Sequence, residues 1–147
     1  MRAKMSWVAA ALLLSTSTIV QAQESRTTQA MRHGAPKGLT ETFFSCINAA
    51  GLDQARMSGC IATERRGQDV RLNKAYAVLM STLDPRSKEA VRLAERAWLD
   101  FNTKTVAAET AIGGANEVTN IDVSQAELFR YCERANVLED YVSSIGK

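Results

Sequence analysis

Three cysteines are the residues of this chain best suited to covalent chemistry. Cys46 and Cys60 are separated by thirteen residues that include Gly51 and Gly59, and both glycines allow the chain to turn back on itself. This spacing favours a disulfide between Cys46 and Cys60. Cys132 then remains as a small core residue on a helix, which is the commoner place for a lone thiol. A bridge between two chains through Cys132 is the alternative.

The other reactive side chains lack the partners that catalysis needs. His33 is the single histidine and lies in a polar segment, so Ser/His/Asp catalysis is not expected. Glu89 and Glu95 are six residues apart, and such residues do not share a helix face, which argues against an acid and base pair. Gly-rich phosphate loops, Cys-x-x-Cys and His-Glu-x-x-His are absent from the sequence, and its one histidine does not suit a zinc site. We therefore expect a binding domain without a cofactor, not an enzyme.

The spacing of apolar residues predicts that helices position these side chains. Thr40 can cap a short helix that ends at Gly51. A longer helix is expected to begin between Gln54 and Ser58 and to continue to Leu83.

A third helix is predicted to start at Asp84, because Asp84 is a good N-cap and Pro85 suits the first helical position. Its connection to the preceding helix is short, so the two should be antiparallel neighbours. The apolar or small residues at +3 and +4 spacing should face the core; they are Val91, Ala94, Trp98, Phe101 and Thr105.

A loop should follow Gly113 and Gly114, and the last helix should open with the capping box formed by Ser124 and Glu127. The residues predicted to form a partner-binding loop are Ala115, Asn116, Glu117, Val118, Thr119 and Asn120. No strand-like alternation occurs after residue 22. We expect an all-α fold, a small antiparallel bundle or hairpin of about four helices, one short and three long.

Residues 1–22 have the pattern of a cleaved signal peptide, with Arg2 and Lys4 ahead of an apolar run that ends at Val20-Gln21-Ala22. We expect a polar, flexible leader over 23–39 and a helical domain over 40–145. The product should be periplasmic or secreted, without a membrane anchor.

Charge gives a second indication about partners. The whole chain has 18 Lys+Arg and 16 Asp+Glu, so removing Arg2 and Lys4 leaves 16 of each and no support for nucleic-acid binding. Residues 106–147 hold seven acidic and three basic residues, which favours a basic protein partner for this part of the chain.

The combined motifs resemble the lysozyme inhibitor LprI-like N-terminal domain family, also described as the DUF1311 family. Besides Cys46 and Cys60, the residues that carry the resemblance are Asp69, Leu72, Asn73, Tyr76, Arg96, Trp98, Phe101 and Arg134. The resemblance implies a small exported helical domain in which these residues are mostly structural, with Trp98 in the core. One branch of the family is associated with lysozyme inhibition, so lysozyme is a candidate partner. The alternative is a protein that assembles with another component of the cell envelope.

The chain departs from the family at its second disulfide. Family members commonly continue after Phe101 with Arg-Asp and then a cysteine, where this chain has Asn102, Thr103 and Val106. The partner cysteine would fall at Ala126. Because both cysteines are missing together, the resemblance leaves the bridge between Cys46 and Cys60 as the remaining one.

Overall fold

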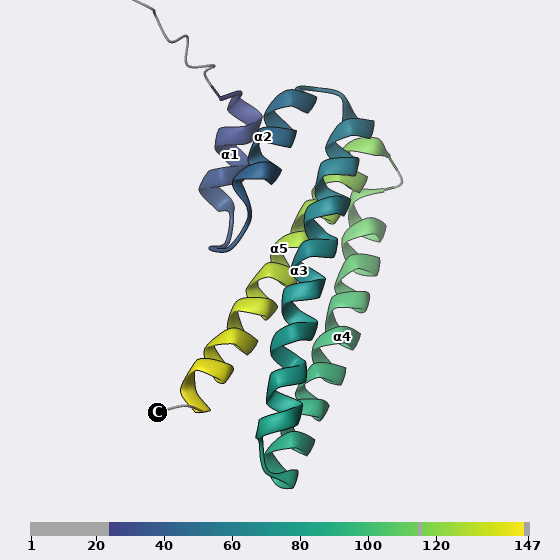
Figure 1. Ribbon diagram of the computed structural model, residues 1–147. Coiled ribbons are helices and arrows are strands. Elements are labelled where there is room, and N and C mark those ends of the chain that lie inside the picture. Colours follow the sequence, from purple (N-terminus) through teal and green to yellow (C-terminus); the bar gives the residue numbers. More distant parts are fainter. Residues whose placement is uncertain (1–23, 115, 146–147) are drawn as a thin grey trace, which may run out of the picture.

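The computed structural model describes residues 24–114 and 116–145, and within these ranges it contains five α-helices and no strand. They are α1 (Arg26–Gly34), α2 (Glu41–Ala50), α3 (Gln54–Thr82), α4 (Pro85–Gly113) and α5 (Glu117–Ile145). The three long helices lie along one another, and α1 and α2 pack together at one end (Figure 1). The prediction of an all-α fold is confirmed, with one helix more than expected. The predicted signal peptide lies outside the described residues.

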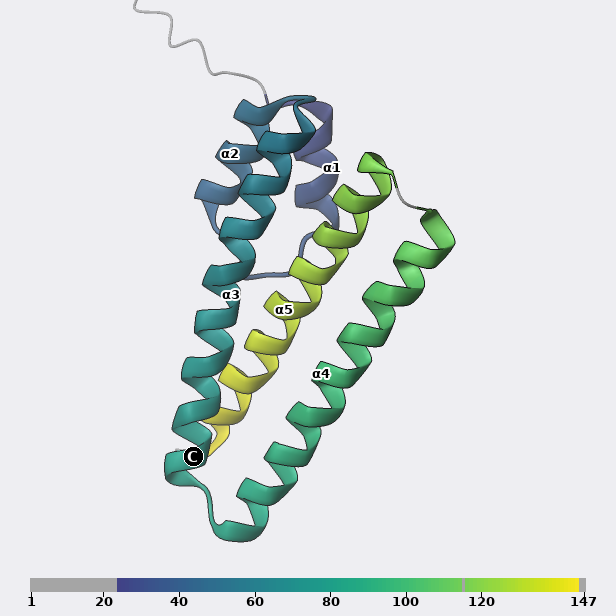
Figure 2. The same ribbon diagram turned by 90° about the vertical axis from the view of Figure 1, so that its right-hand side faces the viewer.

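The core lies mainly between α3 and α5, which run in the same direction (Figures 1 and 2). The helix α4, which connects them in the sequence, runs in the opposite direction. One apolar cluster joins α2, α3 and α5 at the upper end, and it includes Phe43, Phe44, Ile47, Met57, Ile61 and Leu128. The second joins the remainder of α3 and α5, and its buried members are Leu72, Ala75, Leu79, Tyr131, Ala135 and Leu138. The spacing of +3 and +4 along α5 predicts a buried face that runs from Leu128 to Ile145. Its first four residues, Leu128, Tyr131, Ala135 and Leu138, are buried, whereas Val142 is partly buried and Ile145 is 38% exposed. In the described ranges, no helix combines the length and apolar character needed to cross a membrane.

Polar caps fix where the helices begin. The Thr40 hydroxyl accepts a hydrogen bond from the Phe43 amide at 3.1 Å, which caps α2 as predicted. Asp84 accepts from the amides of Arg86 and Ser87 at 2.9 and 3.2 Å, which caps α4. These bonds hold the pKa of the Asp84 carboxyl below its usual range, the largest cause being the Ser87 side chain.

Residues 24–39 of the predicted flexible leader 23–39 contain the helix α1 and side chains that pack against the rest of the molecule. Ser25 caps α1 and accepts from the Thr28 amide, and Thr28 and Met31 are buried against the rest of the molecule. Only one side of this short helix packs on the core, and Met31 is the single large apolar side chain that it buries. The sequence therefore lacks the repeated apolar pattern that predicts a helix.

The connection after α1 is held by side chains of α3 and α5. The Lys37 carbonyl accepts from Asn136 Nδ2 at 2.6 Å and from the Cys132 thiol at 3.4 Å. The Gly38 carbonyl accepts from Gln68 Nε2 at 3.0 Å. These bonds satisfy main-chain groups that have no partner within a helix.

The start of α5 also differs from the prediction, since the capping box at Ser124 lies inside the helix. Asn116 caps α5 instead, because its Oδ1 accepts from the Thr119 amide at 2.9 Å. Asparagine and serine are equally good N-caps, so the earlier of the two signals is the one used. Four residues of the predicted loop therefore form the first helical turn: Glu117, Val118, Thr119 and Asn120. Ala115 lies outside the described residues.

The predicted disulfide is confirmed. Cys46 and Cys60 are bonded, with their Cα atoms 5.8 Å apart, and they join α2 to α3. Cys132 is a free thiol and is completely buried on α5, as expected for a core residue.

Replacing both bridging cysteines by alanine should lower the free energy of unfolding by about 3 kcal/mol, because the open chain gains the entropy that a loop of this length loses when it is closed. Urea unfolding of Cys46→Ala/Cys60→Ala measures this loss. Ser58→Ala, an exposed change in the same region, is the control and should leave the midpoint unchanged. Equal midpoints for the double variant and the unmodified protein would contradict the expected role of the bridge.

Candidate functional site

The fully buried residues of α4 are polar and contact α5, whereas the core between α3 and α5 is mainly apolar. The two buried residues of α4 are Glu95 and Asn102, at 7% and 4% exposure, and Glu109 follows seven residues later. From α5, Arg134 donates to Glu95 through Nε at 2.7 Å and through Nη2. Arg130 donates to Asn102 at 2.9 Å and binds both oxygens of Glu109 at 2.8 and 3.0 Å. Ion pairs and hydrogen bonds therefore set the position of α4.

This contact corrects the predicted inner face of α4. Phe101 is 56% exposed and Ala94 is exposed, so these two residues lie outside the packed side. Trp98 is only partly buried, with its ring edge-to-face with Tyr131 at a centroid distance of 5.0 Å. Glu95 and Asn102 take the inner positions because Arg130 and Arg134 offer them charge-assisted partners; the apolar stripe is rotated partly toward solvent.

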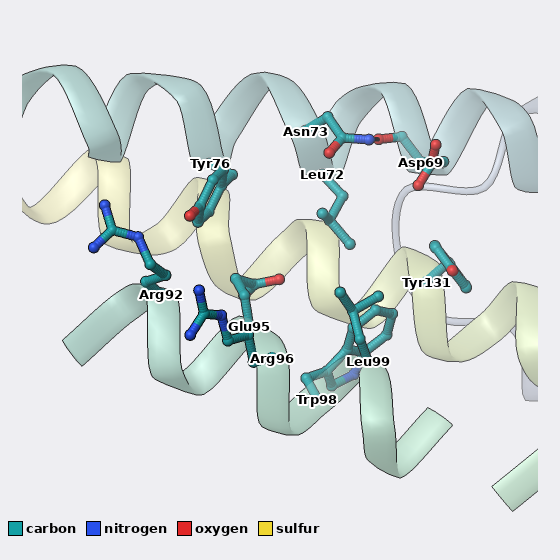
Figure 3. A pocket seen from close by; sticks show the side chains of 10 residues that line it. All are labelled: Asp69, Leu72, Asn73, Tyr76, Arg92, Glu95, Arg96, Trp98, Leu99 and Tyr131. Atoms are coloured by element: carbon teal, nitrogen blue, oxygen red, sulfur yellow. Dashed lines mark hydrogen bonds between the residues drawn. The ribbon is translucent and has the colours of Figure 1, made fainter. Parts of the chain in front are cut away.

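A groove of about 370 Å³ lies between α3 and α4, with Tyr131 of α5 behind it (Figure 3). Six of the eight single residues that carry the family resemblance line it: Asp69, Leu72, Asn73, Tyr76, Arg96 and Trp98. The other lining residues are Arg92, Glu95, Leu99 and Tyr131. Phe101 does not line this groove, and Arg134 lies behind Glu95 as its ion-pair partner. The motif residues therefore converge in space.

Two of the four charges in the groove are neutralised within the chain. Glu95 is paired with α5, and Arg92 is paired with Glu89 at 2.5 Å, which raises the pKa of Arg92. The side chains of Asp69 and Arg96 have no ion-pair partner in the part of the chain that the structure describes. The groove thus offers one free carboxylate and one free guanidinium beside aromatic and aliphatic side chains.

A second hollow, of about 350 Å³, lies between the end of α4 and the start of α5. It is lined by Glu109, Ile112, Gly113, Thr119, Asp122, Val123 and Ala126. We call this end of the two helices the tip. Ile112 and Val118 are 88% and 59% exposed there. Glu117 and Asp122 are exposed and have no ion pair among residues 24–114 and 116–145.

The two positions at which the family resemblance implies a second disulfide lie on α4 and α5. Val106 and Ala126 occupy them and are partly buried. The bidentate pair between Arg130 and Glu109 joins the same two helices. A polar contact therefore connects α4 to α5 in the region where the implied bridge would do so.

Sequence reasoning missed the inward role of Glu95, Asn102 and Glu109, although a usable signal exists. These polar residues repeat every seven positions, and Arg130 and Arg134 are four apart, so each set lies on one side of its helix. The groove residues Arg92 and Leu99 are also seven apart on α4. The seven-residue spacing of Glu95, Asn102 and Glu109, which is typical of residues on one side of a helix, could have indicated that these polar side chains face α5.

No group of histidine, cysteine, aspartate and glutamate that could hold a metal occurs among the described residues. His33 is exposed in the last turn of α1.

These features define a small, disulfide-bonded helical domain with a groove between two long helices and a partly acidic tip. The chain belongs to the lysozyme inhibitor LprI family, because the family model of that description matches residues 46–138. The match includes the disulfide, the groove, the polar contact and the tip, which confirms the resemblance seen in the sequence. No curated protein and no solved structure shows a significant match to the chain.

Breaking the pair between Glu95 and Arg134 should destabilise the fold by about 3 kcal/mol, because Glu95→Gln leaves a buried guanidinium without its counter-charge. Replacing both partners, as Glu95→Leu/Arg134→Met, should cost less than the single change. Urea unfolding measures both. The control is Lys104→Ala, which removes an exposed ion pair with Asp100 and should cost under about 1 kcal/mol. A loss no larger for Glu95→Gln than for Lys104→Ala would contradict this assignment.

The Cys132 thiol should react slowly in the folded protein. Burial raises its pKa above the usual value of 9.0, and the neighbouring Arg71 only partly opposes this effect. A thiol reagent at pH 8 should therefore modify Cys132 at the rate of unfolding and at full speed in denaturant. Immediate modification without denaturant would contradict the burial of this side chain.

The same shift gives a pH dependence with a definite sign. Because the folded pKa is the higher one, the stability linked to this thiol is complete below pH 9.0 and is lost as the pH rises through the folded pKa. Above pH 9.0, the free energy of unfolding of Cys132→Ala should decrease less steeply with pH than that of the unmodified protein. Urea unfolding at a series of pH values measures this difference.

Proposed function

We propose that this chain is an exported, non-catalytic inhibitor that binds a lysozyme-type muramidase and obstructs its substrate cleft. Membership of the lysozyme inhibitor LprI family supports this function. The observation that carries the proposal is the tip, where exposed apolar side chains lie beside carboxylates that no arginine or lysine of the described chain neutralises.

The apolar part of the tip suits contact with another protein. Ile112 and Val118 project into solvent from the end of α4 and the start of α5. Exposed large apolar side chains that gather in one place are typical of protein interaction sites. The end of α4 and the start of α5 lie together at one end of the molecule (Figure 2), where Ile121 packs into the apolar cluster while Ile112 and Val118 remain exposed.

The charge of the tip supports a basic partner. Arg130 and Arg134 form ion pairs with Glu109 and Glu95, so their positive charges are neutralised within the chain. Glu127 and Glu139 of α5 pair with Arg65 and Arg71 of α3, so the acids of α5 without an ion pair among the described residues are Glu117, Asp122, Glu133 and Asp140. A basic enzyme would be attracted to this end and associate faster at low salt.

Export is part of this proposal. The signal-peptide pattern over residues 1–22 supports it, and a disulfide is typical of proteins in an oxidising compartment. The periplasm or the exterior of the cell is also where a muramidase would be met.

Reversing two charges at the tip tests the proposal. Glu117→Lys/Asp122→Lys should weaken binding to a basic muramidase by about tenfold at low salt, because two favourable charges become unfavourable. Calorimetric titration measures binding, and lysis of purified cell walls measures inhibition.

The matched control is Glu133→Lys/Asp140→Lys, which makes the same two substitutions at exposed positions farther along α5. This control should keep most of the affinity. Equal losses in both variants would reject the tip as the contact surface. If an excess of the unmodified protein neither binds muramidases nor slows lysis, the inhibitor proposal fails.

A second candidate function, assembly with another envelope protein, is supported by the outer side of α4. Leu93, Ala97 and Phe101 repeat every four residues there and are all exposed. Cross-linking in intact cells distinguishes the two functions. Recovery of a muramidase alone argues against assembly, and recovery of a different envelope protein argues for it.

A further inference from the structure

The groove between α3 and α4 is separate from the tip, and its lining has a chemistry of its own. Its charges are two carboxylates, Asp69 and Glu95, and two guanidinium groups, Arg92 and Arg96, so the lining is neutral overall. A ligand with a large net charge of either sign would lie against a like charge in the groove. The lining therefore suits a ligand that is uncharged.

The same groove disfavours a purely apolar ligand. Asp69 and Arg96 have no ion-pair partner among the described residues, so covering them with hydrocarbon would remove water from two charged groups without replacing its hydrogen bonds. The ligand should instead supply donors to Asp69 and acceptors to Arg96. Asn73, next to Asp69 on α3, can offer its amide oxygen as an acceptor and its second amide hydrogen as a donor, since the first donates to the Asp69 carbonyl.

The remaining lining is aromatic and aliphatic. Tyr76 on α3 and Trp98 on α4 are both partly buried, so each ring keeps some exposed surface in the groove (Figure 3). Leu99 is 48% exposed, and Leu72 lies at the back. Ring surfaces with small aliphatic neighbours suit a flat ligand that has one apolar side and one hydroxylated edge.

An uncharged sugar has this combination of properties. Its ring carbons present C–H groups on one side, while hydroxyl groups that donate and accept hydrogen bonds surround its edge. The volume of about 370 Å³ is within the range of small-ligand sites. The methyl of an acetamido group would fit beside Leu72 and Leu99, and its carbonyl could accept from Arg96.

We propose that this groove is a binding site for a neutral glycan that contains N-acetylated amino sugars. The sugar ring lies against Tyr76 and Trp98, its hydroxyl groups donate to Asp69 and Asn73, and Arg96 donates to the ligand. Glu95 is a positioning residue, because its bond to Arg134 fixes the part of α4 that forms the groove wall. The site does not depend on muramidase binding by the tip.

The test uses the exported full chain and a short oligomer of N-acetylglucosamine as the probe. Trp98 is the only tryptophan after residue 22, so its fluorescence reports on the groove, and calorimetry gives the affinity independently. Saturable binding is expected, and the de-N-acetylated oligomer should bind more weakly because it lacks the acetamido carbonyl that accepts from Arg96 and brings an ammonium group toward that guanidinium. The absence of saturation up to the solubility limit, or tighter binding of the charged oligomer, overturns the proposal.

Two variants locate the site. Arg96→Ala and Asp69→Ala should each weaken binding of the oligomer about tenfold, because each removes a hydrogen bond to a charged group. Arg66→Ala is the matched control, since this exposed arginine of α3 contacts Thr63 and does not line the groove. Thermal unfolding of every variant verifies that the fold is retained. Unchanged affinity in both groove variants overturns the assignment.

The tip variant separates this site from the proposed function. Glu117→Lys/Asp122→Lys should bind the oligomer as tightly as the unmodified protein, and Arg96→Ala should still bind a muramidase when no wall is present. Loss of oligomer binding in the folded tip variant overturns the groove as the glycan site. Failure of muramidase binding alone concerns only the proposed function.

Discussion

Arg130 and Arg134 of α5 hold α4 by charged hydrogen bonds, whereas α3 and α5 hold each other mainly by apolar packing, to which Arg71 adds an ion pair with Glu139. The difference matters because ion pairs satisfy their geometry in few arrangements, while aliphatic contacts tolerate sliding and rotation. The contact therefore fixes both the rotation and the height of α4. It also turns apolar side chains such as Leu93 and Phe101 toward solvent, where they are available for binding.

Holding α4 in this way also preserves the space between α4 and α3. Phe101, which the predicted inner face would have buried, is instead 56% exposed and does not line the groove. With polar contacts on the α5 side, Trp98 packs on Tyr131 and still keeps part of its ring exposed. Residues that carry the family resemblance thus pack on the core and line the groove together.

The sequence predicted those features of the fold that depend on residues close to one another along the chain. The caps at Thr40 and Asp84, the disulfide, and the buried spacing of α5 all follow from such signals. The rotation of α4 could not be predicted in this way, because it depends on arginines that are more than 30 residues away from Glu95 in the sequence. The helix α1 was missed for a similar reason, since Thr28 and Met31 are buried only after α2 and α3 are in place.

The bonds that hold Lys37 have a consequence for the order in which the molecule can assemble. Its carbonyl binds Cys132 and Asn136, which are 95 and 99 residues farther along the chain. Contacts of such long sequence separation form late, because the intervening chain must first be ordered. The connection around Lys37 therefore reaches its final position only after α5 is in place, although the disulfide already joins the neighbouring α2 to α3.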